Sequence, residues 1–262
     1  MKLLYCGDVV GRAGRDVVMK HVPRLRKEHG LDGVIVNVDN AAGGFGVTHD
    51  ILRDFASAGV DVMPGGDHVF DQKEALSLLG QEPRLLRPHN YPESVAGTGC
   101  RVFTLANSKK LLVLHLLGQV FHKEYLDSPF HCALKALAAY KLGGNVDAIL
   151  VDMHAEATSE KMAMGVFLDG KVSAVVGSHT HVPTADAKLL AGGTAYQTDA
   201  GMCGDYAGTV IGFQPEGPMQ QFLQKTRKIR MEPGRGDGTL CGAIITLKPS
   251  GLAESIVPIQ VS

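Results

Sequence analysis

The sequence predicts an α/β fold, because short apolar runs alternate along the chain with helical patterns. Runs such as GVIV at 33–36 and LLVL at 111–114 are continuously apolar, as expected for strands that are covered on both faces. The alternation in the early half favours a largely parallel sheet. The last third of the chain contains more strand and less helix, which indicates a second sheet or an antiparallel edge.

Each predicted element follows from its own stretch of sequence. Strands are expected where apolar runs close on polar or glycine-rich residues, at 3–8, 33–40, 60–68, 111–118, 146–154, 172–181, 194–201 and 242–249, with a further extended stretch at 254–262. Helices are expected where apolar residues recur at helical spacing, at 15–29, 50–58, 72–79, 131–142 and 159–167. No repeat, low-complexity tract or Pro/Ser linker divides the chain, so residues 1–262 are interpreted as a single domain.

The composition is ordinary for a soluble globular protein and excludes some classes of partner. With 45% hydrophobic residues, 20% charged residues and a net charge of −1, the chain has no overall basic field that would attract nucleic acid or a membrane surface. No apolar stretch approaches the roughly 18 residues of a spanning helix, and the apolar start of the chain is too short for a signal peptide. The five cysteines are scattered and form no CxxC pair, which predicts reduced thiols in a cytoplasmic protein.

Carboxylates, amides and imidazoles follow the ends of several predicted strands. Taken singly, an Asp after a strand is usually a turn or helix-cap residue, and a lone His is more often structural. However, the carboxyl ends of strands in an open α/β sheet form the crevice where ligands bind, so these side chains are expected at one rim. Together they predict a two-metal centre, with bridging carboxylates, imidazoles and an amide as ligands. The residues are Asp8, Asp39, Asn40, Asp67, His68, Asp152, His154, His179 and His181.

Two of these residues, His179 and His181, are separated by a single residue at the end of a β-branched run. On the alternating geometry of a strand, their side chains point the same way. Both histidines are therefore expected to face the crevice and to hold one ion each.

The polar stretches resemble those of a known family. They are GDVVGRAGRD at 7–16, DNAAGGFGVT at 39–48, GGDHVFDQKE at 65–74, DMHAEATSEKMAMG at 152–165 and SAVVGSHTHVPTAD at 173–186. In this order and spacing they resemble the YmdB-like bacterial phosphodiesterases, a branch of the calcineurin-like metallophosphoesterases. The resemblance runs from residue 1 to about 210 and is loose beyond about 215. It implies a four-layer αββα sandwich of the metallophosphoesterase type.

The resemblance also implies a role for each polar residue. One ion would be held by Asp8, Asn40 and His181, with Asp39 as the bridge. The other would share Asp39 and add Asp67, His154 and His179. His68 resembles the residue that protonates the leaving oxygen, and no substrate-binding residue is assigned.

Two positions depart from the family's usual residues. Asp39 stands where the branch usually has Glu, although Asp is the bridging residue of the wider superfamily. Asp67 stands where the branch usually has Asn, so a carboxylate replaces a neutral ligand. With a bridging hydroxide and two divalent ions, the formal charge of the centre then falls from +1 to zero. A neutral centre should attract an anionic phosphate less strongly, or should favour one trivalent iron.

The family resemblance implies a metal-dependent phosphodiesterase that acts on a small-molecule phosphodiester, with 2′,3′-cyclic nucleotides as the leading candidate. In this hypothesis, a hydroxide that bridges two ions attacks phosphorus, and His68 acts as general acid. Mixed nitrogen and oxygen ligands favour iron or manganese, with zinc as a further option. The resemblance also implies a homo-oligomer.

Three alternatives stay open at this level. The chain could be a metal-binding regulator without catalysis, in which Asp67 has abolished turnover. It could be a phosphomonoesterase or a nuclease with the same site, although it lacks a basic surface interleaved with aromatic residues. A nucleotide-binding α/β protein is less well supported, because Gly7, Gly11 and Gly14 do not form a GxGxxG fingerprint. The aperiodic loop at 118–130 could cap the site, form a subunit contact or simply be solvated.

Overall fold

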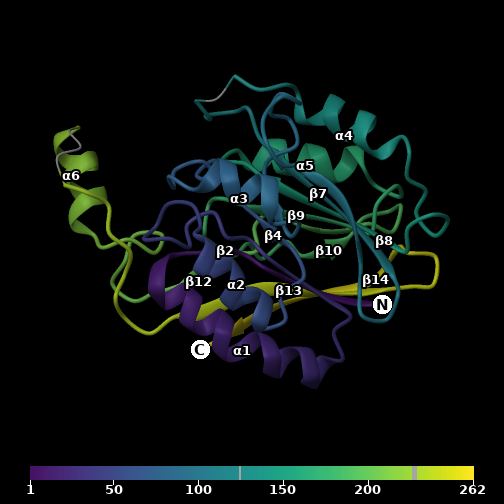
Figure 1. Cartoon of the computed structure of the whole chain (residues 1–262), viewed down its shortest axis with the longest axis horizontal. Helices are drawn as coiled ribbons and strands as arrows, with labels where there is room; N and C mark the ends of the chain where they lie inside the picture. Colours follow the sequence, from purple (N-terminus) through teal and green to yellow (C-terminus); the bar gives the residue numbers. More distant parts are fainter. Residues whose placement is uncertain (124, 226–228) are drawn as a thin grey trace.

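Two six-stranded sheets lie face to face, and helices cover the outer face of each (Figure 1). The computed structural model describes residues 1–123, 125–225 and 229–262. The arrangement is the four-layer αββα sandwich that the family resemblance implies.

The first sheet is mixed, and its order is β2-β12-β13-β1-β3, with β14 also paired to β13. Its strands are β1 (Lys2–Cys6), β2 (Asp8–Val9), β3 (Gly33–Val36), β12 (Met202–Gly204), β13 (Thr239–Leu247) and β14 (Ala253–Val261). β1 and β3 are parallel, whereas β13 runs antiparallel to β1, β12 and β14. The late strands therefore supply an antiparallel part of this sheet, as the strand-rich last third of the sequence predicts.

The second sheet has a parallel centre with antiparallel edges, in the order β10-β11-β9-β8-β7-β6. Its strands are β6 (Cys100–Thr104), β7 (Lys110–Leu117), β8 (Ala148–His154), β9 (Ala174–Ser178), β10 (Lys188–Leu189) and β11 (Ala195–Gln197). A separate two-stranded sheet pairs β4 (Met63–Pro64) with β5 (Leu85–Leu86). The parallel centre carries the carboxyl ends of β7, β8 and β9 to one side.

Strand alternation divides most of the buried apolar side chains among three cores. In β1, Leu4 and Cys6 pack toward the first outer helices, whereas Leu3 and Tyr5 pack between the two sheets. On the second sheet, Leu112 and its outward-facing neighbours form the third core with the other helical layer. The central strands of both sheets are thus covered on both faces, which explains the continuous apolar runs.

The helices are α1 (Gly11–His29), α2 (His49–Ser57), α3 (Ala75–Gln81), α4 (Pro129–Leu137), α5 (Thr158–Phe167) and α6 (Glu216–Gln224). α1 and α2 lie on the first sheet, and α4 and α5 lie on the second (Figure 1). α6 stands apart at one side of the molecule, with Phe222 and Leu223 largely exposed. Within the described residues, the structure has no helix that is long and apolar enough to cross a bilayer.

Some predicted bounds are wrong, and local sequence explains why. The strand expected at 60–68 is only two residues long, because Pro64 lacks an N–H for the ladder and Gly65 and Gly66 follow it. The helix expected at 131–142 begins at Pro129 and ends at Leu137. β6 and α6 were not predicted, since neither has a continuous apolar run or a long helical pattern.

Candidate metal centre

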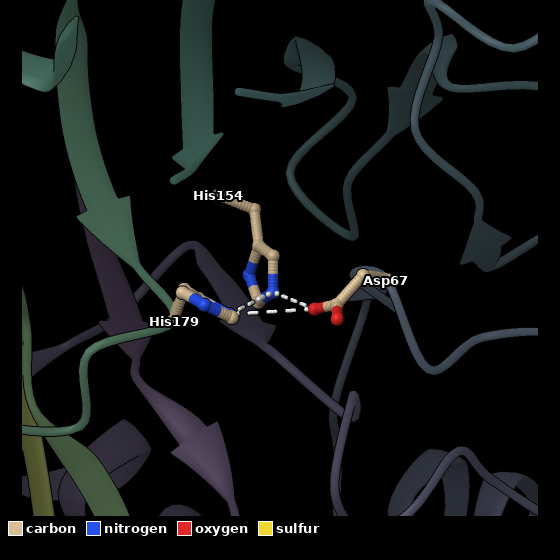
Figure 2. Close-up of side chains that lie close together, drawn as sticks. All are labelled: Asp67, His154 and His179. Carbon is tan, nitrogen blue, oxygen red and sulfur yellow. Dashed lines mark hydrogen bonds and ion pairs between the residues drawn. The ribbon is translucent and has the colours of Figure 1, made fainter. Parts of the chain in front are cut away.

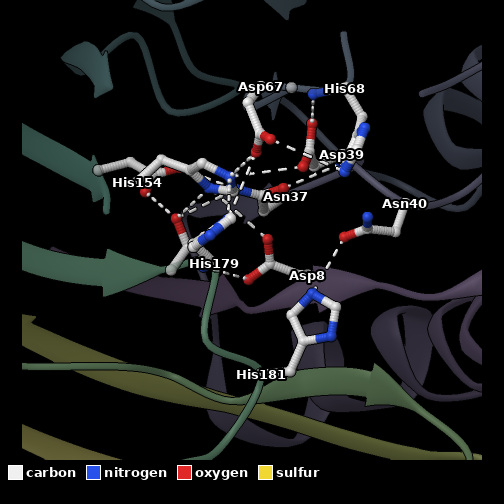
Figure 3. Close-up of polar contacts among 12 residues, drawn as sticks. Asp8, Asn37, Asp39, Asn40, Asp67, His68, His154, His179 and His181 are labelled. Carbon is white, nitrogen blue, oxygen red and sulfur yellow. Dashed lines mark hydrogen bonds and ion pairs between the residues drawn. The ribbon is translucent and has the colours of Figure 1, made fainter. Parts of the chain in front are cut away.

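The predicted site residues meet at one end of the sandwich (Figure 3). Asp8 lies in β2 and Asp39 follows β3, so both come from the first sheet. His154 ends β8 and His179 follows β9, so both come from the second. The expectation of a single rim on one sheet is therefore wrong. Two sheets face each other across the site, and each supplies its own strand ends.

Asp67, His154 and His179 form one convergent group (Figure 2). Asp67 Oδ1 lies 3.1 Å from His154 Nε2 and 3.3 Å from His179 Nδ1. The two imidazole nitrogens are 3.2 Å apart. Three ligand-type atoms from three separate chain segments thus point at the same small volume.

A second group contains Asp8, Asp39 and His154, and a third contains Asp39, Asp67 and His68. Asp39 Oδ2 lies 3.4 Å from His154 Nε2, so this carboxylate stands beside the first group as well. Asp39, Asp67 and His154 each belong to two of the three groups, so the groups form one continuous cluster.

Asn40 and His181 lie together on the far side of Asp8 from His154 (Figure 3). Asn40 Oδ1 is 3.1 Å from His181 Nε2. Asn40 Nδ2 donates to the carbonyl of Gly44, so the amide oxygen is the atom that faces the site. The structure thus brings together the seven residues that the resemblance assigns to the two ions, whereas Asp152 belongs to none of the three groups and contacts Asn37, Ser178 and His115 instead.

The donor set fits metal ions. Asp8 is fully buried, and its Oδ1 has no hydrogen-bond partner within the described residues. Burial raises the pKa of Asp8, and only nearby His154 and His181 oppose that effect. Asp8 Oδ1 lies 3.6 Å from His154 Nδ1, which is beyond hydrogen-bond distance. A buried carboxylate oxygen that accepts no hydrogen bond is costly in a protein interior, and a cation compensates for that cost.

The electrostatics of the other group follow the same pattern. Burial by itself would raise the pKa of Asp67, but hydrogen bonds and charge pairing with His154 and His179 lower it. Burial by itself would lower the pKa of His154, but the carboxylates of Asp39, Asp67 and Asp8 raise it well above its usual value. Without a cation, a proton on the imidazole is what balances these carboxylates.

Each of the three histidines has its second ring nitrogen next to an oxygen atom. His154 Nδ1 lies 2.9 Å from Ser178 Oγ, and His181 Nδ1 donates to the carbonyl of Ile211 at 2.7 Å. His179 Nε2 lies 3.2 Å from Glu156 Oε2. Such contacts fix ring orientation and tautomer in metal sites, so the remaining nitrogen of each ring is held toward the centre.

Sequence reasoning did not single out Glu156 and Asn37. Asn37 Nδ2 contacts Asp152, His154 and Ser178 within the buried end of the site. Both residues lie two positions from a candidate ligand, Glu156 after His154 and Asn37 before Asp39. On a strand this spacing places side chains on the same face, and it is the signal that could have found Asn37.

His68 lies at the edge of the centre and is partly exposed (Figure 3). Its Nδ1 lies 2.8 Å from Asp71 Oδ2, and its Nε2 lies 3.7 Å from Asp67 Oδ2. Although burial opposes it, the carboxylates of Asp39, Asp67 and Asp71 raise the pKa of His68. The ring therefore holds a proton more readily than usual and presents Nε2 to the centre.

The geometric reason given for the two neighbouring histidines is wrong. β9 ends at Ser178, and both His179 and His181 have positive φ values, 93° and 64°. They do not alternate as strand residues. Instead, a turn in the left-handed region sends His179 toward Asp67 and His181 toward Asn40. The two histidines still face two different groups of candidate ligands, as predicted, but a turn and not strand alternation directs them there.

Gly66 allows the loop that carries Asp67 to approach the second sheet. A Cβ at this position would overlap the imidazole of His154. Any other residue would push the loop away from β8 and separate Asp67 from His154.

The loop at 118–130 reaches the centre through His122; residue 124 lies outside the described residues. The ring of His122 packs against His179 with centroids 4.9 Å apart. Burial, with His179 and His154 nearby, lowers the pKa of His122 to about 4, so the ring is neutral at pH 7. Of the three readings of this loop, the contact favours a cap on the site.

The fold and the convergent carboxylates and imidazoles are those of the metallophosphoesterase class. Within that class, the model of the YmdB-like protein family matches residues 4–259. The chain belongs to the YmdB-like family.

Similar proteins agree with this assignment. The chain is 40% identical over 247 residues to a Bacillus subtilis protein named 2′,3′-cyclic-nucleotide 2′-phosphodiesterase, covering 94% of this chain and 91% of that one. A crystal structure described as a novel phosphatase from Mycoplasma pneumoniae superposes with a TM-score of 0.92 at 31% identity, covering 100% and 93%. A hypothetical protein from Thermus thermophilus superposes with a TM-score of 0.91 at 38% identity, covering 99% and 98%.

Proposed function

We propose that this protein is a dinuclear-metal-dependent phosphodiesterase that hydrolyses 2′,3′-cyclic nucleotides. The observation that carries the proposal is the convergence of Asp8, Asp39, Asp67 and three histidines in a buried site, with one buried carboxylate oxygen that accepts no hydrogen bond. The name of the Bacillus subtilis relative supports the substrate class.

In this proposal, the ligands divide between two ions. Asp8, Asn40 and His181 would hold one ion, Asp67, His154 and His179 would hold the other, and Asp39 would be shared between them. Mixed carboxylate, amide and imidazole ligation favours iron or manganese, with zinc as a further option. Two such ions supply Lewis acidity that lowers the pKa of water and neutralises charge on a phosphate.

The side chains then perform the remaining steps. The oxygen of a water molecule forms a bond to phosphorus while the bond from phosphorus to the 2′-oxygen breaks, and a proton of the water passes to solvent. His68 donates a proton from Nε2 to the departing 2′-oxygen. Asp71, beside Nδ1, orients the ring and favours its protonated form. A positioned acid of this kind contributes on the order of 10²–10⁴ in rate.

The proposal is tested by hydrolysis of 2′,3′-cAMP with added Mn²⁺ or Fe²⁺. Wild type is compared with His68→Ala and with His131→Ala, which alters an exposed histidine of α4. We expect turnover by wild type and His131→Ala, and a loss of at least about 10²-fold in His68→Ala with metal content unchanged. A nucleoside monophosphate and a short RNA serve as competing substrates.

Each other outcome selects another function. Metal binding without turnover on any substrate would favour the regulator. Faster hydrolysis of the monophosphate or the RNA would favour a phosphomonoesterase or a nuclease. A wild-type protein without bound metal would refute the proposal.

We further propose that residues 1–262 form a single domain and that the protein is a cytoplasmic homo-oligomer. The described cysteines are all free, which is usual in a reducing compartment. The exposed Phe222 and Leu223 of α6 offer an apolar surface to a second copy. Light scattering after size-exclusion chromatography tests the oligomeric state, and a single calorimetric transition is expected of one domain.

A further inference from the structure

A buried ion pair lies beside the centre and takes no part in the proposed chemistry. Lys161 of α5 and Asp199, which follows β11, have fully buried side chains. Lys161 Nζ lies 2.8 Å from Asp199 Oδ2. Removing both charges from water costs free energy that their attraction only partly returns, so such a pair is weak evidence for stabilisation. The hydrogen bonds that the pair makes to neighbouring residues therefore matter more than its own contribution to stability.

The ion pair holds Thr180. The hydroxyl of Thr180 donates to Asp199 Oδ2 at 2.6 Å, and its backbone N–H donates to the same oxygen at 3.1 Å. Lys161 Nζ also donates to the hydroxyl at 3.3 Å. The other oxygen of Asp199 accepts the N–H of Gly201, which fixes the carboxylate to its own segment. Thr180 is thus bound through both backbone and side chain.

Thr180 stands between His179 and His181, which have φ values of 93° and 64°. Non-glycine residues adopt this region rarely and at a cost in free energy, and they persist there only where the surroundings enforce it. The bonds to Thr180 help to enforce it, because they hold the residue between the two, and the N–H of His179 also donates to Asp8 Oδ2 at 3.1 Å. His179 and His181, which have strained backbones, thus stand on either side of the tightly held Thr180.

This turn serves both sides of the centre. His179 Nδ1 faces Asp67, whereas His181 Nε2 faces Asn40. An extended backbone through these residues would direct both rings the same way. The left-handed turn is what separates them toward different ligand groups.

We propose that Asp199, neutralised by Lys161, is a positioning residue that clamps Thr180 and thereby sets His179 and His181 for two separate ions. The inference rests on the proposed dinuclear centre. It predicts that loss of one hydroxyl, which touches no ligand atom, weakens the binding of both ions together.

The test removes the hydroxyl and then restores it. Thr180→Val and Thr180→Ala delete the bond from the hydroxyl to Asp199 and leave the backbone bond, and Thr180→Ser retains both. Thr194→Val is the matched control, because Thr194 is a buried threonine, its hydroxyl donates to the carbonyl of Val172 at 2.8 Å, and it precedes β11 at the end away from the site. Mn²⁺ is the probe. Its stoichiometry and affinity are measured by titration, and the coupling between two ions by electron paramagnetic resonance.

We expect wild type, Thr180→Ser and Thr194→Val to bind two Mn²⁺ ions and to give the spectrum of a coupled pair. Thr180→Val and Thr180→Ala should bind both ions about 10–100-fold more weakly and lose the coupled spectrum at limiting Mn²⁺. The metal-free melting temperatures of Thr180→Val and Thr194→Val should fall by similar amounts, which separates positioning from general stability.

Three results would overturn the inference. If wild type binds two ions and the Thr180 variants bind them equally well, the clamp is unnecessary while the dinuclear centre stands. If Thr194→Val weakens metal binding as much, or Thr180→Ser fails to restore it, the effect is one of general stability. If wild type binds no Mn²⁺, Fe²⁺ or Zn²⁺, the proposed function fails, and the inference fails with it.

Discussion

Ser178→Ala tests how far the buried end of the site controls a candidate ligand. Ser178 is the last residue of β9 and is fully buried. Its hydroxyl donates to Asp152 Oδ1 at 2.6 Å and lies 2.9 Å from His154 Nδ1. The substitution deletes one oxygen atom, leaves a cavity too small to matter, and removes the contact that orients His154 from behind.

The expected size of the effect follows from these contacts. A hydrogen bond to a charged group contributes roughly 1.5–3 kcal/mol, and Asp152 keeps Asn37 as a partner at 3.2 Å. We expect a loss of about 2 kcal/mol in the free energy of unfolding. With about 2.1 cal/mol/K of unfolding entropy per residue, this lowers the Tm of the 262-residue chain by about 4 °C. The affinity for the ion held by His154 should fall about 10–100-fold.

The assay separates these two effects. Thermal unfolding of the chelator-treated protein gives the stability change, and titration with Mn²⁺ against a chelating indicator gives the affinity. Ser173→Ala is the control, because Ser173 is also fully buried and its Oγ accepts the N–H of Ile149 at the other end of β9. A lower Tm with metal affinity within twofold of wild type would refute the idea that Ser178 orients His154.

Three further predictions concern single side chains. Asp67→Asn should raise the formal charge of the metal-loaded centre by one and lower KM for the anionic diester several-fold; an unchanged or higher KM would contradict this. His122→Ala should lower kcat about 10-fold or more if the loop caps the site, whereas unchanged steady-state kinetics would show that the loop is only a surface segment. Burial, with Lys20 and Arg24 nearby, lowers the pKa of His21, and its Nε2 has no partner within the described chain. The neutral ring is therefore favoured in the fold, so stability is complete above about pH 6.5 and falls as the pH drops below it, by at most about 1.4 kcal/mol per pH unit. Urea unfolding of metal-free wild type and His21→Leu at pH 7.5 and 5.5 should show the steeper loss in wild type; equal losses would count against this.

Much of the architecture can be predicted from the sequence because its signals are local. The runs at 33–36, 111–114 and 148–151 become strands that are buried on both faces. The helical pattern at 159–167 becomes α5 within one residue at its start. The bound at 60–68 fails because Pro64 and the following glycines interrupt the run, so that only Met63 and Pro64 pair with β5.

The candidate ligands were also predicted, since Asp, Asn and His at strand ends stand out against apolar runs. The sequence could not reveal that two facing sheets supply them, because which strands share a sheet depends on long-range pairing. It could not reveal Glu156 behind His179 either, because that contact requires the turn after β9.

The sequence by itself therefore determined the class of fold and the chemistry available at the site, because both depend on the identity and local order of residues. Only the tertiary structure decided the direction of each ligand. The positive φ values of His179 and His181 flank Thr180, which is hydrogen-bonded to Asp199 and Lys161. Those contacts join three separate segments, and their geometry exists only after the sheets have packed.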